Sequence, residues 1–261
     1  MEALVIHAPG DLRVEEVPTP ELEAGQLLVR VRCGGICGSD LHYYQHGGFG
    51  TVRIQEPMVL GHEVAGMIEA VGPGTSFKAG ERVAISPSRP CGRCRYCQEG
   101  LQNHCLDMRY YGSAMRTPHV QGAFRQQIVV EQWQAHRLAD SVSDGEGAMA
   151  EPLSVALHAV RRAGPLLGKR VLVTGCGPIG ALAIVAARRA GASHIVATDV
   201  GNDTAVEELI EGTLGRHGRG LGRGVRARRP ARPPQHRVRP RRLARGPGDA
   251  AAPGRARMTP G

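Results

Sequence analysis

Short apolar runs, several of them alternating with polar residues, recur through the first 150 residues of the chain. Four are clear, at residues 26–33, 63–72, 81–86 and 124–131, and glycine and proline are frequent in the intervals between them. An alternation of period two is typical of half-buried strands, and glycine and proline mark the turns that join strands. Residues 1–150 are therefore predicted to form a small, irregular β-domain.

The pattern changes at about residue 151. The run EPLSVALHAVRRAG, residues 151–164, places its apolar side chains at helical spacing. Residues 169–200 then read as a strand, a glycine-rich turn, a helix and a second strand. This order is typical of a βαβ unit with parallel strands, so we expect an α/β segment over residues 151–205.

Charge is distributed unevenly along the chain. The formal net charge is +9, but residues 213–261 hold fourteen arginines against one aspartate, so residues 1–212 carry a net charge of −4. This basic segment has no aromatic residue and is rich in Arg, Gly and Pro. It cannot bury enough apolar surface to offset its ordering entropy, and residues 206–261 are predicted to be a disordered tail. Any nucleic-acid binding by the tail would be nonspecific, because no aromatic side chain is available to stack on bases.

Four of the seven cysteines lie close together in the sequence. No secretory signal and no membrane-spanning apolar run is apparent, which predicts a cytoplasmic protein with reduced thiols. Reduced cysteines at C-x2-C-x2-C-x7-C spacing favour a metal site, and four thiolates close a tetrahedron around a structural Zn²⁺. An iron–sulfur cluster is the alternative occupant, and four unliganded thiols are the third interpretation. The predicted ligands are Cys91, Cys94, Cys97 and Cys105.

A glycine motif sits between the first strand and the helix of the βαβ unit. Its glycines allow a tight turn and a close approach to a pyrophosphate, which would bind at the helix N-terminus. Asp199 ends the following strand, where an acidic side chain accepts hydrogen bonds from the adenosine ribose and repels a 2′-phosphate. The motif predicts NAD in preference to NADP; the alternative is a glycine turn that binds nothing. The predicted cofactor-binding residues are Gly175, Gly177, Pro178, Ile179, Gly180 and Asp199.

Other candidate metal ligands are scattered through the chain. Taken singly, a histidine on a strand or an isolated cysteine is usually an ordinary core residue. Together they supply a thiolate, an imidazole and carboxylates, which suit a three-ligand zinc site with one position open to substrate. The candidates are Cys37, His62, Glu63 and Glu151.

The order of these motifs resembles a known family. The motifs follow in the order Cys37-Gly-Ser39-x-x-His42, Gly61-His62-Glu63, the four cysteines, and Glu151-Pro152 before the glycine motif. This order is similar to that of the zinc-dependent medium-chain alcohol and polyol dehydrogenases of the sorbitol-dehydrogenase-like branch. The resemblance implies a GroES-like β-barrel catalytic domain over residues 1–150, with a structural zinc lobe at 91–105. It implies that an incomplete Rossmann domain follows over residues 151–205.

The resemblance also implies a chemistry. Cys37 and His62 would hold a catalytic zinc, with Glu63 and Glu151 both candidates for the remaining ligand, so that each chain would bind one catalytic and one structural zinc. Hydride would pass between a secondary alcohol of a polyol or an L-idonate-like sugar acid and NAD. Ser39 and His42 would carry the hydroxyl proton away. A homo-oligomer is expected at full length.

The family pattern is lost soon after Asp199. The Arg-, Gly-, Pro- and Ala-rich sequence that follows is typical of GC-rich coding DNA read out of frame, so we expect a truncated or frameshifted dehydrogenase whose own activity is impaired. A non-catalytic, zinc-stabilised fragment is the second hypothesis. A nonspecific nucleic-acid binder acting through its tail is the third.

Overall fold

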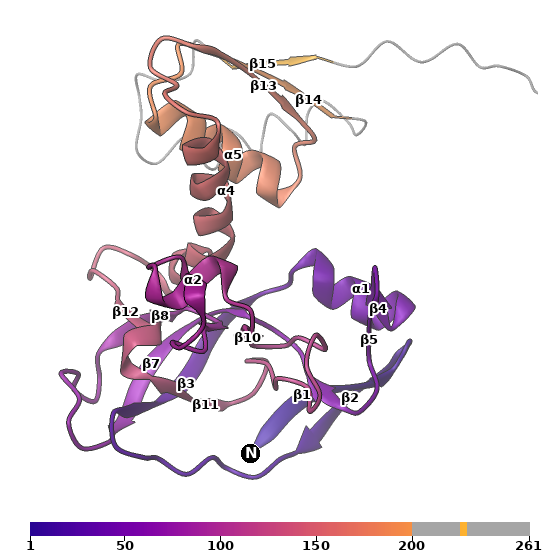
Figure 1. Cartoon of the computed structure of the whole chain (residues 1–261), viewed down its shortest axis with the longest axis vertical. Coiled ribbons are helices and arrows are strands. Elements are labelled where there is room, and N and C mark those ends of the chain that lie inside the picture. Colours follow the sequence, from indigo (N-terminus) through magenta and orange to yellow (C-terminus); the bar gives the residue numbers. More distant parts are fainter. Residues whose placement is uncertain (200–224, 229–261) are drawn as a thin grey trace, which may run out of the picture. The chain divides into compact units, whose positions relative to one another are not determined.

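The computed structural model describes residues 1–199 and the backbone of residues 225–228 (Figure 1). Its largest sheet has five strands in the order β11-β3-β7-β8-β12, and every neighbouring pair is antiparallel. The four apolar runs identified in the sequence coincide with four of these strands, which confirms their prediction. The strands are β3 (Gln26–Gly35), β7 (Glu63–Val71), β8 (Arg82–Ile85), β11 (Gln127–Glu131) and β12 (Ala135–Arg137).

Smaller strand pairs complete this part of the chain. β1 (Glu2–Ala8) lies between β2 (Asp11–Glu16) and β6 (Met58–Val59), again with antiparallel pairing. Two short antiparallel pairs follow. They are β4 (Gly48–Phe49) with β5 (Val52–Arg53), and β9 (Ser88–Arg89) with β10 (Arg109–Tyr110).

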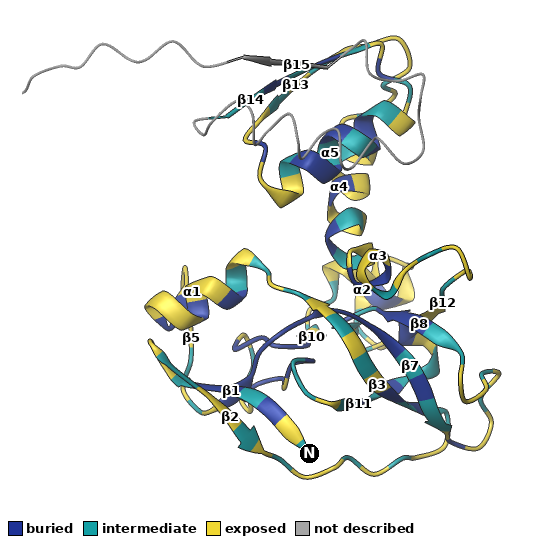
Figure 2. Ribbon diagram, turned by 180° about the vertical axis from the view of Figure 1, so that it is seen from behind, coloured by how far each residue is buried: buried dark blue, intermediate teal, exposed yellow. Residues whose placement is uncertain are grey.

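The main core lies on one face of the five-stranded sheet. Alternate residues of β3 and β11 are fully or almost fully buried, as the period of two requires: Leu27 and Val29 on one strand, Ile128 and Val130 on the other. Figure 2 shows β7 largely buried, in agreement with its run of buried residues from Glu63 to Gly66. Burial of each large apolar side chain stabilises the fold by about 1.5–3 kcal/mol.

Short helices occupy the connections between strands. The helices are α1 (Gly38–His46), α2 (Arg95–Gln98), α3 (Asp144–Ala148) and α4 (Ala150–Arg162). Two 3₁₀ turns lie in other connections, Gln102–His104 before β10 and Gln132–Gln134 between β11 and β12. α3 begins at a capping box in which Ser143 and Glu146 satisfy each other's backbone N–H groups. α4 confirms the helix predicted from residue 151 onwards.

The βαβ unit forms as predicted. β13 (Arg170–Thr174), α5 (Pro178–Arg189) and β14 (His194–Thr198) are in sequence order, and the two strands pair in parallel. Buried Ile184 and Ala187 of α5 pack with Ile195 and Ala197 of β14 to form a second core cluster. The described part of the chain is thus a mixed α/β structure.

One strand differs from the sequence expectation. β15 (Val225–Arg228) pairs in parallel with β14, giving the sheet order β13-β14-β15. These four residues fall within the segment predicted to be a disordered tail. The rest of residues 206–261, and with it the remainder of that prediction, lies outside the described residues. Within the described residues, no helix is long and apolar enough to span a membrane.

Candidate metal centres and nucleotide-binding turn

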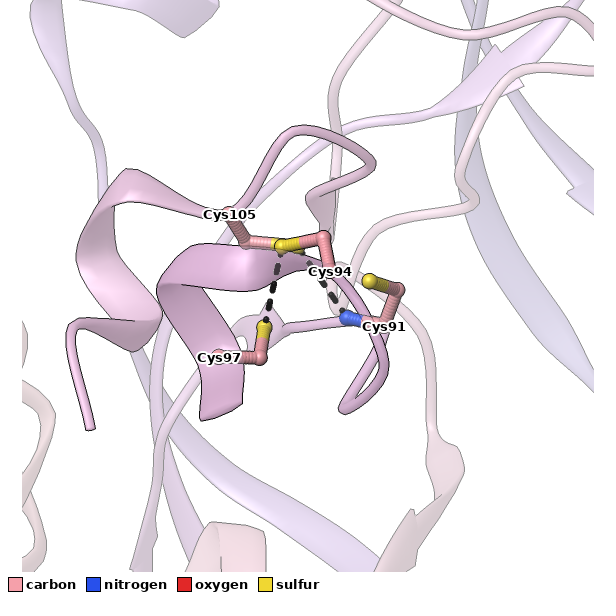
Figure 3. Close-up of side chains that lie close together, drawn as sticks. All are labelled: Cys91, Cys94, Cys97 and Cys105. Atoms are coloured by element: carbon pink, nitrogen blue, oxygen red, sulfur yellow. Dashed lines mark hydrogen bonds between the residues drawn. The ribbon is translucent and has the colours of Figure 1, made fainter. Parts of the chain in front are cut away.

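The four clustered cysteines converge on one point. Their Sγ atoms all lie within 4.8 Å of one another, and Figure 3 shows them gathered around helix α2. The Sγ atom of Cys94 is 3.6 Å from that of Cys97 and 4.0 Å from that of Cys105. Thiolates at the corners of a tetrahedron with Zn–S bonds of about 2.3 Å would be about 3.8 Å apart. The cluster therefore fits a four-thiolate zinc site with no open position.

Backbone N–H groups donate hydrogen bonds to the sulfur atoms of this cluster. Cys91 N–H donates to the Cys105 sulfur over 3.2 Å. Hydrogen bonds from the backbone N–H groups of Leu106 and Cys97 lower the pKa of the Cys94 thiol to about 6, so this group is largely thiolate at neutral pH. Burial and the neighbouring thiols raise the pKa of Cys97 to about 12. A bound cation would therefore be needed to hold all four groups as thiolates.

A second cluster forms where α1 meets the start of β7. Cys37 is the N-cap residue of α1, His62 precedes β7 and Glu63 is its first residue. One ligand atom from each lies within 4.8 Å of the others. The pairing of β3 with β7 sets Gly35 opposite Glu63, and a Cβ on Gly35 would lie 2.2 Å from a carboxylate oxygen of Glu63. Glycine at this position leaves the room that the Glu63 side chain needs.

Electrostatics at this second cluster favour a charged thiolate. A hydrogen bond with His62 lowers the pKa of the Cys37 thiol, and Ser39 adds a further hydrogen bond to the same sulfur. Burial alone would lower the pKa of His62, but the partners Cys37 and Asp40 outweigh it and raise the pKa overall. Burial raises the pKa of Glu63. The buried Nδ1 atom of His62 has no hydrogen-bond partner among the described residues. A thiolate, an imidazole and a carboxylate in this arrangement fit a divalent metal with an open position.

Asp40 supports this cluster, although it was not among the predicted site residues. The side chain is buried and accepts the N–H of Cys37 over 3.0 Å and that of Gly61 over 3.2 Å. One of its oxygens lies 3.8 Å from Nδ1 of His62. At this distance the two groups interact through charge and not through a hydrogen bond. Asp40 therefore ties the start of α1 to the segment that carries His62.

We expect Asp40→Ala to lower the free energy of unfolding by about 3 kcal/mol, because two hydrogen bonds to a buried carboxylate are lost at about 1.5 kcal/mol each. Urea titration of metal-free protein measures this change. Asp107→Ala is the matched control, since Asp107 makes only a partly exposed ion pair with Arg116. Equal stability of the Asp40 and Asp107 variants would contradict a stabilising role for the two Asp40 hydrogen bonds.

Glu151 lies beside the second cluster but outside the group that converges within 4.8 Å. It belongs to the first turn of α4, and its charge contributes to raising the pKa of His62. Its Oε1 atom accepts a hydrogen bond from the Tyr110 hydroxyl over 2.5 Å. The Tyr110 ring is also 5.5 Å from the His62 ring, centroid to centroid. The sequence analysis did not identify Tyr110.

The two predicted proton carriers lie on α1. Ser39 is in its first turn and contacts the Cys37 sulfur. His42 is exposed, with its ring 5.9 Å from that of His46 and 6.3 Å from that of Phe49. Only Ser39 of this pair is thus in direct contact with a candidate metal ligand.

The glycine motif adopts the turn that its sequence predicts. Gly175 has a φ of +87°, which favours glycine, and Gly177 caps α5 with Pro178 in the first helical turn. The side chain of Ile179 is about half exposed. The Asp199 carboxylate accepts the N–H of Cys176, inside the turn, over 2.5 Å. Asp199 is therefore fixed beside the turn where a nucleotide would bind.

Gly180 is required by close packing. A Cβ there would lie 1.9 Å from the carbonyl oxygen of Gly175, whereas a Cβ on Gly177 would meet nothing within 4 Å. We expect Gly180→Ala to destabilise the βαβ unit by about 2 kcal/mol through overpacking. Gly177→Ala is the control and should destabilise the unit by less, about 1 kcal/mol or below, because it loses only the N-cap preference of glycine over alanine. Equal melting temperatures for the two variants would rule out this account of the turn.

Comparison with known proteins agrees with this geometry. Residues 23–140 match the family model described as "Alcohol dehydrogenase GroES-like domain". The chain is 49% identical over 173 residues to L-idonate 5-dehydrogenase (NAD(P)(+)) of Escherichia coli strain K12, covering 66% of this chain and 50% of that protein. It is 41% identical over 201 residues to sorbitol dehydrogenase of Bacillus subtilis strain 168, covering 77% and 56%.

A solved structure extends the comparison to the fold. The crystal structure of L-idonate 5-dehydrogenase from Escherichia coli K-12 superposes with a TM-score of 0.79 at 39% identity, covering 89% of this chain and 63% of that one. The chain spans about half the length of the curated relatives described above. The match supports a GroES-like amino-terminal domain followed by a short Rossmann-like start.

Proposed function

We propose that this chain, which belongs to the zinc-type medium-chain dehydrogenases in the sorbitol dehydrogenase branch, carries the catalytic half of an enzyme that oxidises a secondary alcohol of a polyol or an L-idonate-like sugar acid with NAD. The observation that carries the proposal is the convergence of Cys37, His62 and Glu63 within 4.8 Å. The identity to L-idonate 5-dehydrogenase supports the sugar-acid substrate.

Cys37, His62 and Glu63 would hold the catalytic ion directly, because their ligand atoms converge, and Glu151 would act from beside them. When bound, Zn²⁺ lowers the pKa of an alcohol hydroxyl and polarises the corresponding carbonyl. The four-cysteine cluster would hold the structural ion. Ser39, which is in contact with the Cys37 sulfur, would accept the hydroxyl proton. His42 lies one helical turn further along α1 and is exposed, so it would pass that proton to solvent.

The proposed cofactor residues are the glycine turn, with Pro178 and Ile179, and Asp199. Asp199 is held at the turn by Cys176 N–H, where its negative charge would disfavour a 2′-phosphate. We expect Asp199→Ala to weaken NADH binding about tenfold, the equivalent of one charged hydrogen bond, with NADPH affected less. Fluorescence titration with each cofactor measures the ratio of the dissociation constants for NADH and NADPH. A wild-type preference for NADPH would contradict the role of Asp199.

The proposed domain boundaries are those predicted from the sequence. Residues 1–150 would form the GroES-like barrel domain and residues 151–205 the start of a Rossmann domain. Cytoplasmic location and homo-oligomerisation of the full-length enzyme belong to the same proposal.

A chimera tests the function. Residues 1–199 of this chain would be joined to the remaining carboxyl-terminal part of the Escherichia coli L-idonate 5-dehydrogenase, aligned on the solved structure. All candidate zinc ligands then come from this chain. NADH formation should be fastest with L-idonate, slower with sorbitol and negligible with ethanol. Oxidation of ethanol alone would contradict the substrate class, and preference for sorbitol would overturn the L-idonate assignment.

A further inference from the structure

Tyr110 makes two contacts that join separate parts of the candidate catalytic site. Its hydroxyl donates to Glu151 over 2.5 Å, and its ring lies 5.5 Å from that of His62. In this hydrogen bond the hydroxyl is the donor and the Glu151 carboxylate is the acceptor. The tyrosine thus sits between a candidate metal ligand and a carboxylate that does not converge with the ligands.

The backbone at Tyr110 is fixed by its surroundings. Tyr110 ends β10, where it pairs with Ser88 of β9. The chain between these two strands carries the four-cysteine cluster, so a metal bound there would close the loop at whose end Tyr110 lies. The tyrosine is therefore a firmly placed donor rather than a mobile surface side chain.

The Glu151 side chain could turn away from Tyr110 toward either of two neighbouring places. One is the cluster of Cys37, His62 and Glu63, which its charge already influences. The other is a hollow of about 610 Å³ that Glu151 and Tyr110 both line, together with Ser154 and His158. Because two other places are accessible to it, the Glu151 carboxylate needs a hydrogen-bond donor to hold it in one orientation.

We propose that Tyr110 is a positioning residue whose hydroxyl keeps the Glu151 carboxylate from becoming a further ligand of the metal held by Cys37, His62 and Glu63. The inference rests on the proposed catalytic metal site. Three protein ligands leave one position open for the substrate oxygen, and a second carboxylate would close it. By holding Glu151 beside the metal, Tyr110 preserves that open position.

Cobalt spectroscopy on the 261-residue chain tests this inference without an activity assay. Co²⁺ takes the place of zinc, and its visible absorption bands depend on which atoms occupy its coordination positions. Subtracting the spectrum of a His62→Ala variant removes the contribution of cobalt in the four-cysteine cluster. The remaining spectrum reports the coordination of the site at Cys37, His62 and Glu63.

We expect Tyr110→Phe to shift the visible bands of this cobalt difference spectrum, as the Glu151 carboxylate takes the position that was open. Adding Glu151→Gln to that variant should restore the original spectrum, because the amide is a poor ligand. Tyr111→Phe is the matched control. Tyr111 is the neighbouring buried tyrosine, its hydroxyl donates to Gln134 over 3.1 Å, and its loss should leave the spectrum unchanged.

Three results would overturn the inference. An unchanged spectrum in Tyr110→Phe would mean that Glu151 turns into the hollow or stays where it is. A changed spectrum in Glu151→Gln alone would mean that Glu151 is already a ligand, and this variant decides the question even where Tyr110→Phe does not fold. Absence of any cobalt signal sensitive to His62 would instead refute the proposed metal site itself.

Discussion

Replacing His62 with Ala should remove one zinc ion per chain and reduce L-idonate oxidation by the chimera at least about 1,000-fold, since loss of the ion removes several kcal/mol of stabilisation of the developing alkoxide. The imidazole is buried near Cys37 and Asp40, and among the described residues His62 is the one histidine of the converging group. Metal analysis by mass spectrometry and the rate of NADH formation measure the two effects.

His7→Ala is the matched control for this prediction. His7 pairs with Glu15 across β1 and β2 and belongs to neither converging cluster. It should keep both zinc ions and near-normal turnover. Near-normal turnover in His62→Ala would remove the basis of the catalytic assignment, whereas loss of both ions would point to general unfolding.

The double variant Cys97→Ser, Cys105→Ser should lose the other zinc ion and melt about 10 °C below the wild type, because several kcal/mol of structural metal binding no longer support the folded state. The loop between β9 and β10 should open first, since the cysteine cluster closes it. Differential scanning calorimetry and metal analysis check both expectations.

Cys33→Ser is the control for the cysteine cluster. Cys33 lies half buried on β3 and belongs to neither converging group. Its replacement should leave the zinc content unchanged. Unchanged zinc content in the Cys97, Cys105 double variant would refute the structural site, and bound iron with sulfide in the wild type would favour the iron–sulfur alternative.

Much of the fold could be predicted because its signals are local. The alternating runs that became β3, β7, β8 and β11 carry their own period, and the glycine motif carries its own turn geometry. The four cysteines lie within fifteen residues, so their spacing alone places the thiolates together. In each of these cases the residues that interact are near one another in the sequence.

The interactions that could not be predicted join distant residues through side-chain packing. Tyr110 and Glu151 are 41 positions apart, and Asp40 reaches Gly61 over 21 positions. An aspartate in the first turn of a helix is ordinarily a capping or dipole-stabilising residue, which gives no hint of a second partner. The choice between Glu63 and Glu151 stayed open for the same reason. Both carboxylates look equivalent in the sequence, whereas in the fold the strand pairing sets Glu63 opposite Gly35, and Glu63 converges with Cys37 and His62 within 4.8 Å.

The strand β15 is a further example. Its sequence, VRAR, has no extended apolar run, and a composition argument assigned it to a disordered tail. Its pairing depends on the exposed edge of β14, which composition does not describe.

Removal and return of zinc tests the central claim most directly. The candidate metal ligands of the chimera all come from residues 37–151 of this chain. The chimera would be treated with a chelator, assayed with L-idonate and NAD, and assayed again after two equivalents of Zn²⁺, one for each site, are added. We predict that NADH formation disappears with the chelator and returns with zinc, and that Mg²⁺ does not replace it. NADH formation that persists at full rate in verified zinc-free protein would contradict the account.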